Sequence, residues 1–370
     1  MTEGAPDAFL AAPRSGLEGV AWPALLPEWQ AKLLAIEFQL EQSEWWTAEE
    51  LREHQLQQLS MLLSHAARTV PFYAAHLAAS GYRPDQPLTP ALWSRLPMLG
   101  RESLQSNPDA LTTRAIPPGH GKVGEYQVAA GDGAPLRLRR TELAQLMRQV
   151  FFLREEIWHR RELEGKVAVI HPDPGGGAAH PAGRREPDWG PPMGHLYRTG
   201  PLVRLDSRVP LAEQAEWLMR EAPAYLLASP TEISPLAQHF RAHSLKLPGL
   251  KGVRSMGHAL PQEIRALVHE AWGVPLTHIY RADEVGPIAL QCPEHEQFHI
   301  QSESALVEVL NAQGRPCAAG ETGRVVATPL HDFAMPLIRY ELRHFAEVGA
   351  ACPCGRGLPV LTRLFGPHAP

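Results

Sequence analysis

Cysteine is scarce in this 370-residue chain, which contains only four. Four are too few for a disulfide scaffold at this length, so the fold must depend on a hydrophobic core. No run of about 18 apolar residues exists, which excludes a transmembrane helix. The first residues, MTEGAPDAFLAAPRSG, place an acidic residue where a secretory signal needs positive charge. We therefore expect a cytoplasmic protein with no membrane partner.

Positive charge is not concentrated anywhere in the sequence. The 35 lysines and arginines against 40 acidic residues give a formal net charge of −5, and no basic block exists. This argues against nucleic acid as the main partner. What the chain does have is 44% hydrophobic residues, together with 36 prolines and 30 glycines. Such a composition is typical of a globular protein with many loops and one large or two ordinary domains.

The first part of the chain is expected to be helical. Apolar residues recur at spacings of three and four between about residues 28 and 79. Thr47 with Glu50 predicts a capping box at the start of the second helix, which Pro71 ends. Thr89 followed by proline predicts a further short helix. We expect residues 1–110 to form a helical segment that packs on the body of the protein.

The middle of the chain alternates between the two kinds of secondary structure. A long helix is expected over 141–161 and a short strand over 166–170. From YLLA to VPLTHIY the pattern is β-α-β-α-β, which predicts a mainly parallel sheet covered by helices. ALVEVL, GRVVATPL and MPLIRY then predict antiparallel strands. The expected fold is α/β, with a body at 111–286 and a small β lobe at 287–370.

A long segment at 172–195 is rich in glycine and proline and has no periodicity. Segments of this kind are functional lids or disordered inserts, and both alternatives stay open. Trp189, Tyr197 and Tyr225 would surround a pocket near this segment. These three side chains fit an aryl ligand and an ordinary core equally well.

The stretch VAAGDGAPLRLRR has the glycine and proline spacing of a tight phosphate-binding loop. Gly131, Gly133 and Pro135 provide this spacing, and the backbone N–H groups of such a loop can bind an anion. The hydroxyl groups of an anion cradle are missing, and Asp132 adds a carboxylate. Two unit charges about 4 Å apart repel by roughly 4 kcal/mol at an effective dielectric constant near 20. We therefore expect a phosphate to be bound poorly here.

Cysteine and histidine gather in two places near the C-terminal end. CPEHEQFHI contains Cys292, His295 and His299, and CPCGRG contains Cys352 and Cys354. Thiolate and imidazole groups suit zinc, and four of them complete a tetrahedron. We predict zinc ligands at Cys292, His299, Cys352 and Cys354, with His295 as the competitor for His299.

A Cys₃His set leaves no open coordination position, so the predicted zinc is structural. It would staple the antiparallel lobe. A zinc-dependent hydrolase would need an open position, which this set does not offer. Cys317 is interpreted as a plain core thiol. The competing interpretation is that all four cysteines are scattered core residues.

The last third of the chain resembles the phenylacetate–CoA ligase-like branch of the adenylate-forming superfamily. The resemblance is carried by QCPEHEQFHIQSESALVEVLNAQGRPCAAGETGRVVATPL, AMPLIRY and CPCGRGLPVL, with LSHAARTVPFYAAHL and PAYLLASPTEISPLA similar to earlier segments. It covers about residues 57–366. The resemblance implies the N-terminal-domain architecture of these enzymes and supports zinc, because members of the branch carry a Cys/His site there. It also implies a reaction of ATP with a carboxylic acid to an acyl adenylate, usually then passed to coenzyme A.

The resemblance also assigns a nucleotide site. Tyr280 would stack on adenine, and Glu284 would help to hold magnesium, with Arg281 between them where a small residue is expected. Arg343 and His344 stand where the family has the aspartate that binds the ribose hydroxyls. A carboxylate accepts two hydroxyl hydrogen bonds, whereas a neutral imidazole accepts only one.

Further departures concern the loop and the hinge. The phosphate loop corresponds to residues 128–135, where only Gly133 and Pro135 keep the family's residue types. His258 replaces an acid, and the Gly-Arg hinge reads Gly366 followed by proline. The chain also stops before the family's C-terminal cap domain, whose lysine contacts the acyl phosphate. We interpret the site as a relic, formed by Tyr280, Glu284, Gly131 and Gly133, and assign no catalytic residue.

Two functions are compatible with these residues. In the first, the chain is a catalytically impaired or repurposed family member that keeps a pocket for a carboxylic or aryl acid and acts with an active ligase or carrier. In the second, it is an active AMP-forming carboxylate–CoA ligase whose C-terminal domain is supplied by another chain.

Overall fold

A computed structural model describes residues 12–84, 86–130, 133–257 and 259–367, and the chain divides into two compact units. Unit 1 consists of Met1–Ala35 and Phe152–Ile279, and unit 2 of Ile36–Phe151 and Tyr280–Pro370. The three segments expected from the sequence stay a prediction beside these units. Within the described ranges, no helix combines the length and the apolar character that crossing a bilayer requires.

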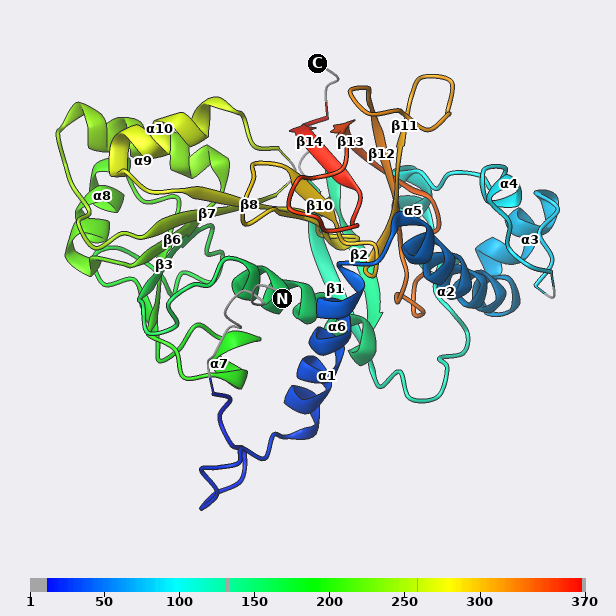
Figure 1. The fold of residues 1–370 in the computed structure, drawn as a ribbon, viewed down its shortest axis with the longest axis horizontal. Coiled ribbons are helices and arrows are strands. Elements are labelled where there is room, and N and C mark those ends of the chain that lie inside the picture. The colour runs from blue at the N-terminus through cyan, green and yellow to red at the C-terminus, as the bar shows by residue number, and fades with distance from the viewer. Residues whose placement is uncertain (1–11, 85, 131–132, 258, 368–370) are drawn as a thin grey trace, which may run out of the picture. The chain divides into compact units, whose positions relative to one another are not determined.

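Unit 1 contains the parallel strands that the β-α-β pattern predicts (Figure 1). Its strands are β3 (Val167–His171), β4 (Arg184–Glu186), β5 (Leu202–Asp206), β6 (Tyr225–Ala228), β7 (Gly252–Gly257) and β8 (Leu276–Ala282, which ends in unit 2). Their order is β4-β5-β3-β6-β7-β8. The pairs β5–β3, β3–β6 and β6–β7 are parallel, and only the edge strand β4 is shown to pair antiparallel.

The helices α8 (Leu211–Glu221), α9 (Pro230–Ala242) and α10 (Glu263–Trp272) each bury one apolar face in the same core as these strands. The unit also contains the short helix α7 (Met193–Leu196). In α9, Ser229 and Glu232 form a capping box, and the residues Ile233, Leu236 and Phe240 on one face are buried in the core of the unit. The α/β class with mainly parallel strands is confirmed.

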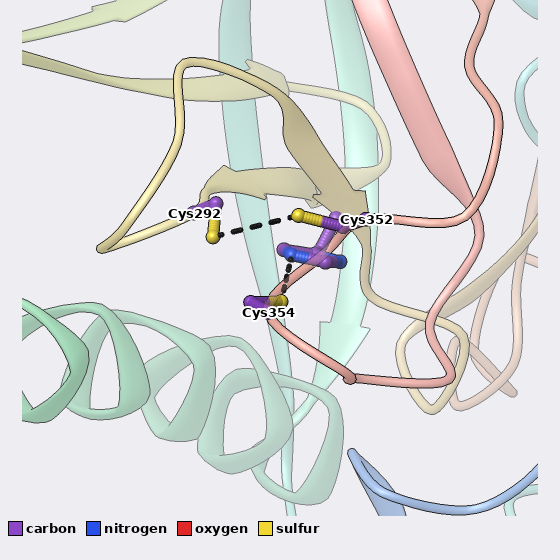
Figure 2. Close-up of side chains that lie close together, drawn as sticks. Cys292, Cys352 and Cys354 are labelled. Atoms are coloured by element: carbon purple, nitrogen blue, oxygen red, sulfur yellow. Dashed lines mark hydrogen bonds between the residues drawn. The ribbon is translucent and has the colours of Figure 1, made fainter.

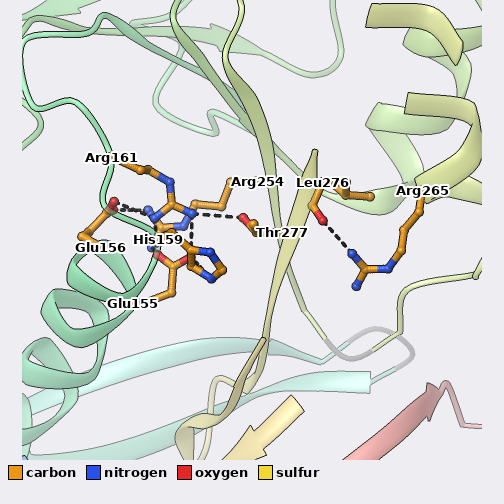
Figure 3. Close-up of polar contacts among 8 residues, drawn as sticks. All are labelled: Glu155, Glu156, His159, Arg161, Arg254, Arg265, Leu276 and Thr277. Carbon is orange, nitrogen blue, oxygen red and sulfur yellow. Dashed lines mark hydrogen bonds and ion pairs between the residues drawn. The ribbon is translucent and has the colours of Figure 1, made fainter. Parts of the chain in front are cut away.

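A buried charge network connects α6 (Glu142–Trp158) to two strands of unit 1 (Figure 3). Arg161 lies 2.7 Å from Glu155 and 2.8 Å from Glu156. Arg254 of β7 also pairs with both carboxylates, at 2.6 Å from Glu155. Arg161 donates a further hydrogen bond of 3.0 Å to Thr277 of β8. The two buried carboxylates are therefore matched by two guanidinium groups.

Unit 2 is built on antiparallel strands. It contains β1 (Val123–Ala130), β2 (Gly133–Thr141), β9 (Gly286–Gln291), β10 (Phe298–Ile300), β11 (Ala305–Leu310), β12 (Thr322–Pro329), β13 (Tyr340–Val348) and β14 (Val360–Phe365). The strands β1 and β2 form a separate hairpin, and the others follow the order β11-β12-β13-β14-β10-β9. The antiparallel β lobe is thus confirmed.

The N-terminal helices of unit 2 pack on this sheet. They are α2 (Ala48–Thr69), α3 (Pro71–Ala79), α4 (Pro90–Trp93) and α5 (Arg101–Ser106), preceded by α1 (Glu28–Ser43), which begins in unit 1. Leu59 and Leu63 of α2 share one core with Val325 of β12. The capping box of Thr47 and Glu50 and the Thr89 cap are confirmed. Pro71 ends α2 as expected and also opens α3.

The prediction of a strand over MPLIRY is wrong, because β13 begins only at Tyr340. The preceding backbone finds other partners: the Tyr73 hydroxyl donates to the Pro336 carbonyl at 3.0 Å and accepts from the Ile338 N–H at 3.0 Å. Arg339 adopts a left-handed φ of 50°. Its buried guanidinium pairs with Glu308 at 3.0 Å. These side-chain contacts replace the strand ladder.

The glycine- and proline-rich segment 172–195 carries some regular structure, namely β4 and most of α7. Trp189 is buried, its indole N–H donates to the Gly165 carbonyl at 2.8 Å, and its ring meets that of Tyr225 edge-on at 5.9 Å. The Tyr225 hydroxyl accepts from the Glu162 N–H at 2.9 Å. These contacts favour packing for the two aromatic residues, and Tyr197 is buried as well.

Candidate metal centre and nucleotide-site residues

The four predicted metal ligands lie together in unit 2. Cys292 directly follows β9, and His299 is the middle residue of β10. Because β10 pairs antiparallel with both β9 and β14, the loop before β14 is brought beside them, and this loop carries Cys352 and Cys354. One ligand atom from each residue lies within 4.8 Å of all the others (Figure 2).

The distances between these atoms suit a tetrahedral zinc ion. The sulfurs of Cys292 and Cys352 are 3.8 Å apart, and the Cys354 sulfur is 3.4 Å from Nε2 of His299. Zinc bonds of about 2.3 Å to sulfur and about 2.0 Å to nitrogen place tetrahedral ligands about 3.8 Å (S to S) and about 3.5 Å (S to N) apart. The cluster could therefore bind a metal such as zinc.

Burial disfavours free thiolates in this cluster. It raises the pKa of Cys292, and it raises the pKa of Cys352 to about 12. Burial acts on Cys354 in the same direction, but hydrogen bonds from the backbone and side chain of Arg356 outweigh it and lower the pKa of that thiol. A metal must displace the protons of the two raised thiols, so binding is expected to release protons.

The competing candidate His295 does not join the cluster, and Cys317, interpreted as a core thiol, also lies outside it. His295 is exposed in the turn between β9 and β10, and its backbone rather than its imidazole approaches Cys292. Cys317 is half-buried and packs against the large core of unit 2. Sequence reasoning missed Arg356, although its position two residues after Cys354 is visible in CPCGRG.

The stretch interpreted as a phosphate loop forms the end of the β1–β2 hairpin. Ala130, the last residue of β1, pairs with Gly133, the first residue of β2. Gly131 and Asp132 lie outside the described residues, as does His258. The sequence indicated a turn here but not the two long strands that lead into and out of it.

Glu284, the candidate magnesium ligand, is engaged by side chains of unit 2. Its Oε1 lies 2.8 Å from a guanidinium nitrogen of Arg101 and accepts a 3.2 Å hydrogen bond from the Tyr340 hydroxyl. Arg148 donates to the Glu284 carbonyl at 2.9 Å and pairs with Asp332 at 3.1 Å. The backbone and the carboxylate of Glu284 are thus both held by cations.

The adenine and ribose candidates are in contact with each other. Tyr280 is 0% exposed and belongs to the core of unit 2. Its hydroxyl lies 3.2 Å from Nδ1 of His344, and burial raises its pKa above the usual range. Arg281 pairs with Asp283. Arg343, just before His344, has a left-handed φ of 55°.

Arg140 of β2 is a further cation at this place that sequence reasoning missed. It is buried, lies over the Tyr126 ring, and donates to the carbonyls of Asp283 and Glu284. Burial and, secondly, the charge of Arg148 lower its pKa to about 10. The turn that contains Glu284 is therefore fixed from several sides by arginine.

No protein-family model matches the chain. Two curated proteins named phenylacetate-coenzyme A ligase are similar to it. The Thermus thermophilus protein is 33% identical over 141 residues, which is 36% of this chain and 32% of that protein. The Pseudomonas putida protein is 24% identical over 323 residues, covering 83% of this chain and 69% of its own length. The first alignment therefore spans about a third of its relative.

The fold is similar to solved structures of a 2-hydroxyisobutyryl-CoA ligase. The open conformation, in complex with 2-HIB-AMP and CoA, has a TM-score of 0.69 at 18% identity, covering 88% of this chain and 77% of that one. The postadenylation state with 2-HIB-AMP also has a TM-score of 0.69, at 19% identity, covering 86% and 68%. The chain therefore has the fold of the N-terminal domain of adenylate-forming enzymes. The two curated relatives also confirm the resemblance to phenylacetate–CoA ligases that was predicted from the sequence.

Proposed function

We propose that this chain is a repurposed phenylacetate–CoA ligase-like protein that does not itself make an acyl adenylate. It keeps the adenylate-forming fold and a structural zinc at Cys292, His299, Cys352 and Cys354. Its ligand is a carboxylic or aryl acid, and it acts together with an active ligase or a carrier protein. The observation that carries the proposal is that the Glu284 carboxylate is already paired with Arg101 and hydrogen-bonded by Tyr340.

A carboxylate that holds magnesium must present oxygen lone pairs to the ion. In this chain the Arg101 guanidinium, at 2.8 Å, already supplies a cation to Glu284, and the Tyr340 hydroxyl adds a hydrogen bond of 3.2 Å. Magnesium would have to displace or share these partners, at the cost of leaving Arg101 without its carboxylate. The Arg101 side chain is only 16% exposed, and a largely buried cation that loses its partner destabilises the fold. The internal ion pair therefore competes with the metal–nucleotide complex.

The remaining nucleotide contacts support the same proposal. Tyr280 is 0% exposed, so it offers no free face on which an adenine could stack. His344, at the ribose position, is 3.2 Å from the Tyr280 hydroxyl. Asp132, from the sequence, would oppose a phosphate by roughly 4 kcal/mol, and the weaker ribose contact costs about 1 kcal/mol. Together these losses of about 5 kcal/mol would slow adenylation more than a thousandfold.

The alternative is an active AMP-forming ligase whose C-terminal domain comes from another chain. The observations that favour it are the β1–β2 hairpin at the position of the family's phosphate loop and the retained residue types at Tyr280 and Glu284. This alternative needs the Arg101–Glu284 ion pair to open when nucleotide and magnesium bind.

Pyrophosphate exchange into ATP tests the proposal. We expect no exchange above background for the full chain with a panel of aryl and short-chain acids at high enzyme concentration. A partial-restoration variant, Asp132→Ser, Arg281→Ser and His344→Asp, supplies a hydroxyl, a small residue and the ribose carboxylate. We expect it to bind ATP more tightly than the natural chain by calorimetry and still to show no exchange, because it keeps the Arg101–Glu284 ion pair. Robust exchange by the natural chain would refute the proposal and establish the ligase.

A further inference from the structure

Arg356 connects the candidate metal centre to a distant part of the chain. Its guanidinium donates to the Cys354 sulfur and pairs with Glu44 at 3.0 Å and with Glu294 at 3.3 Å. The side chain of Arg356 is only 10% exposed, and that of Glu44 only 7%. Glu44 precedes Arg356 by 312 positions and lies in the corner between α1 and α2.

The backbone around Arg356 is attached to the same corner. The Gly357 N–H donates to the Glu44 carbonyl at 2.9 Å. At Gly357 a Cβ atom would lie 1.7 Å from the Trp46 carbonyl oxygen, so only glycine permits this approach. The Arg356 guanidinium lies over the Trp45 ring, 4.9 Å from its centroid. The loop that carries Cys352 and Cys354 is thus joined to the α1–α2 corner by a backbone hydrogen bond, an ion pair and a cation–π contact.

Besides joining the two segments, Arg356 can compensate the charge of the occupied metal centre. Zn²⁺ with three thiolates and a neutral imidazole carries one net negative charge. The cluster is mostly buried, and an uncompensated charge at such a place is unfavourable. Arg356 is the cation that touches a ligand sulfur, and Glu44 fixes its orientation. Groups in this position orient the ligands of a metal and tune its affinity.

We propose that Arg356 is a positioning residue that neutralises the metal–thiolate centre and couples its occupancy to the α1–α2 corner. With metal bound, the charge of the centre holds the Arg356 guanidinium in place over the Trp45 ring. With the metal removed, the four ligands are no longer held in one arrangement, the Arg356 guanidinium loses its fixed partner, and the corner loosens. Trp45, which is 51% exposed, is the built-in reporter of this change.

Zinc affinity tests the first half of the proposal. The full-length chain, Arg356→Met and Arg356→Lys are stripped of metal and titrated with zinc against a chromophoric chelator. We expect Arg356→Met to bind zinc about 10- to 100-fold more weakly, with Arg356→Lys between it and the natural chain. The matched control is Arg363→Met, because Arg363 of β14 also lies over an aromatic ring, that of Phe365 at 5.0 Å, but is not one of the arginines bonded to Cys354.

A spectroscopic signature separates this role from a structural one. With Co²⁺ in place of zinc, the thiolate-to-metal charge-transfer bands should shift in Arg356→Met and stay unchanged in Arg363→Met. Metal removal should also change the Trp45 fluorescence, taken as the difference from Trp45→Phe, and this change should vanish in Arg356→Met.

If Arg356→Met binds zinc within twofold of the natural chain and its bands are unshifted, the proposal is overturned. If Arg356→Met does not fold, the same measurements on Arg356→Lys decide. Failure of the natural chain to bind zinc at all would refute the metal centre itself, independently of the nucleotide site.

Discussion

Burial lowers the pKa of His331 to about 4, with a further contribution from the charge of His120 and an opposing one from Asp332. In the unfolded chain a histidine titrates near 6.5, so between about pH 6.5 and 4 the unfolded state binds more protons than the folded state. The free energy of unfolding must therefore fall as the pH drops through this window. By the linkage relation, the shift in pKa lowers the free energy of unfolding by at most about 3 kcal/mol over this window. We expect a decrease of about 1 to 3 kcal/mol.

Thermal unfolding between pH 7 and 5 checks this expectation. The variant His331→Gln should flatten the dependence of Tm on pH, because the neutral side chain takes up no proton. The exposed His269 of α10 supplies the control His269→Gln, which should leave the slope unchanged. Equal slopes for the natural chain and His331→Gln would show that His331 is not the responsible group.

Single residues could be predicted from the sequence where their partners are close by or of a telling chemical type. Thr47 and Glu50 are three positions apart, and their capping box is visible in the pattern. The ligand set Cys292, His299, Cys352 and Cys354 is marked by residue type alone. Arg356 and Arg101 carry no such mark, because their carboxylate partners lie 312 and 183 positions away. Only the fold brings such pairs together.

The charge network of unit 1 controls how α6 joins β7. Burial by itself raises the pKa of Glu155, but the charges of Arg161 and Arg254 outweigh it and lower the pKa to about 2. Replacing Glu155 with glutamine leaves two guanidinium groups with a single buried carboxylate. Breaking a buried pair in this way costs about 3 to 5 kcal/mol. We therefore expect Glu155→Gln to lower the free energy of unfolding by that amount, measured by urea unfolding.

The control for this variant is Glu270→Gln. Glu270 pairs with Arg241 at 2.9 Å, but both side chains are about half exposed, so the change should cost at most about 1 kcal/mol. If the two variants unfold at the same urea concentration, the network does not stabilise unit 1.

Helices and strands with a strong periodicity of apolar residues could be predicted from the sequence. The predictions that failed did so for local reasons. The helix α9 has a cap, a proline in its first turn and an apolar face, and each of these is visible in the sequence. The strands β1 and β2 were not predicted, because the glycine and proline residues of this stretch also fit a tight phosphate-binding loop. In MPLIRY the apolar residues indicated a strand, but Tyr73 and Thr328 bind the backbone N–H groups of that segment.

At the scale of the whole molecule, the metal centre belongs to unit 2 alone, since all four candidate ligands lie in Tyr280–Pro370. Chelation should therefore lower the transition temperature of unit 2 and leave that of unit 1 unchanged. Differential scanning calorimetry of the full chain with and without a chelator measures both. Cys317→Ser is the control, because Cys317 lies outside the cluster and the variant should keep the metal-dependent shift. A single transition that chelation does not move would contradict a structural metal.

The sequence separation of the ligands gives the metal a role in the unfolded chain as well. Cys292 and Cys352 are 60 positions apart, and β10, β11, β12 and β13 all lie between them. A cross-link that closes a loop of this length removes conformational entropy worth about 4 kcal/mol from the unfolded state, on the scale used for disulfides. A zinc ion captured early by the two cysteine-containing segments would bring the end of β9 close to the loop before β14, with β10 between these two strands in the sheet. The strands between them would then have to form their contacts within a closed loop, which shortens the effective distance over which each pair must meet.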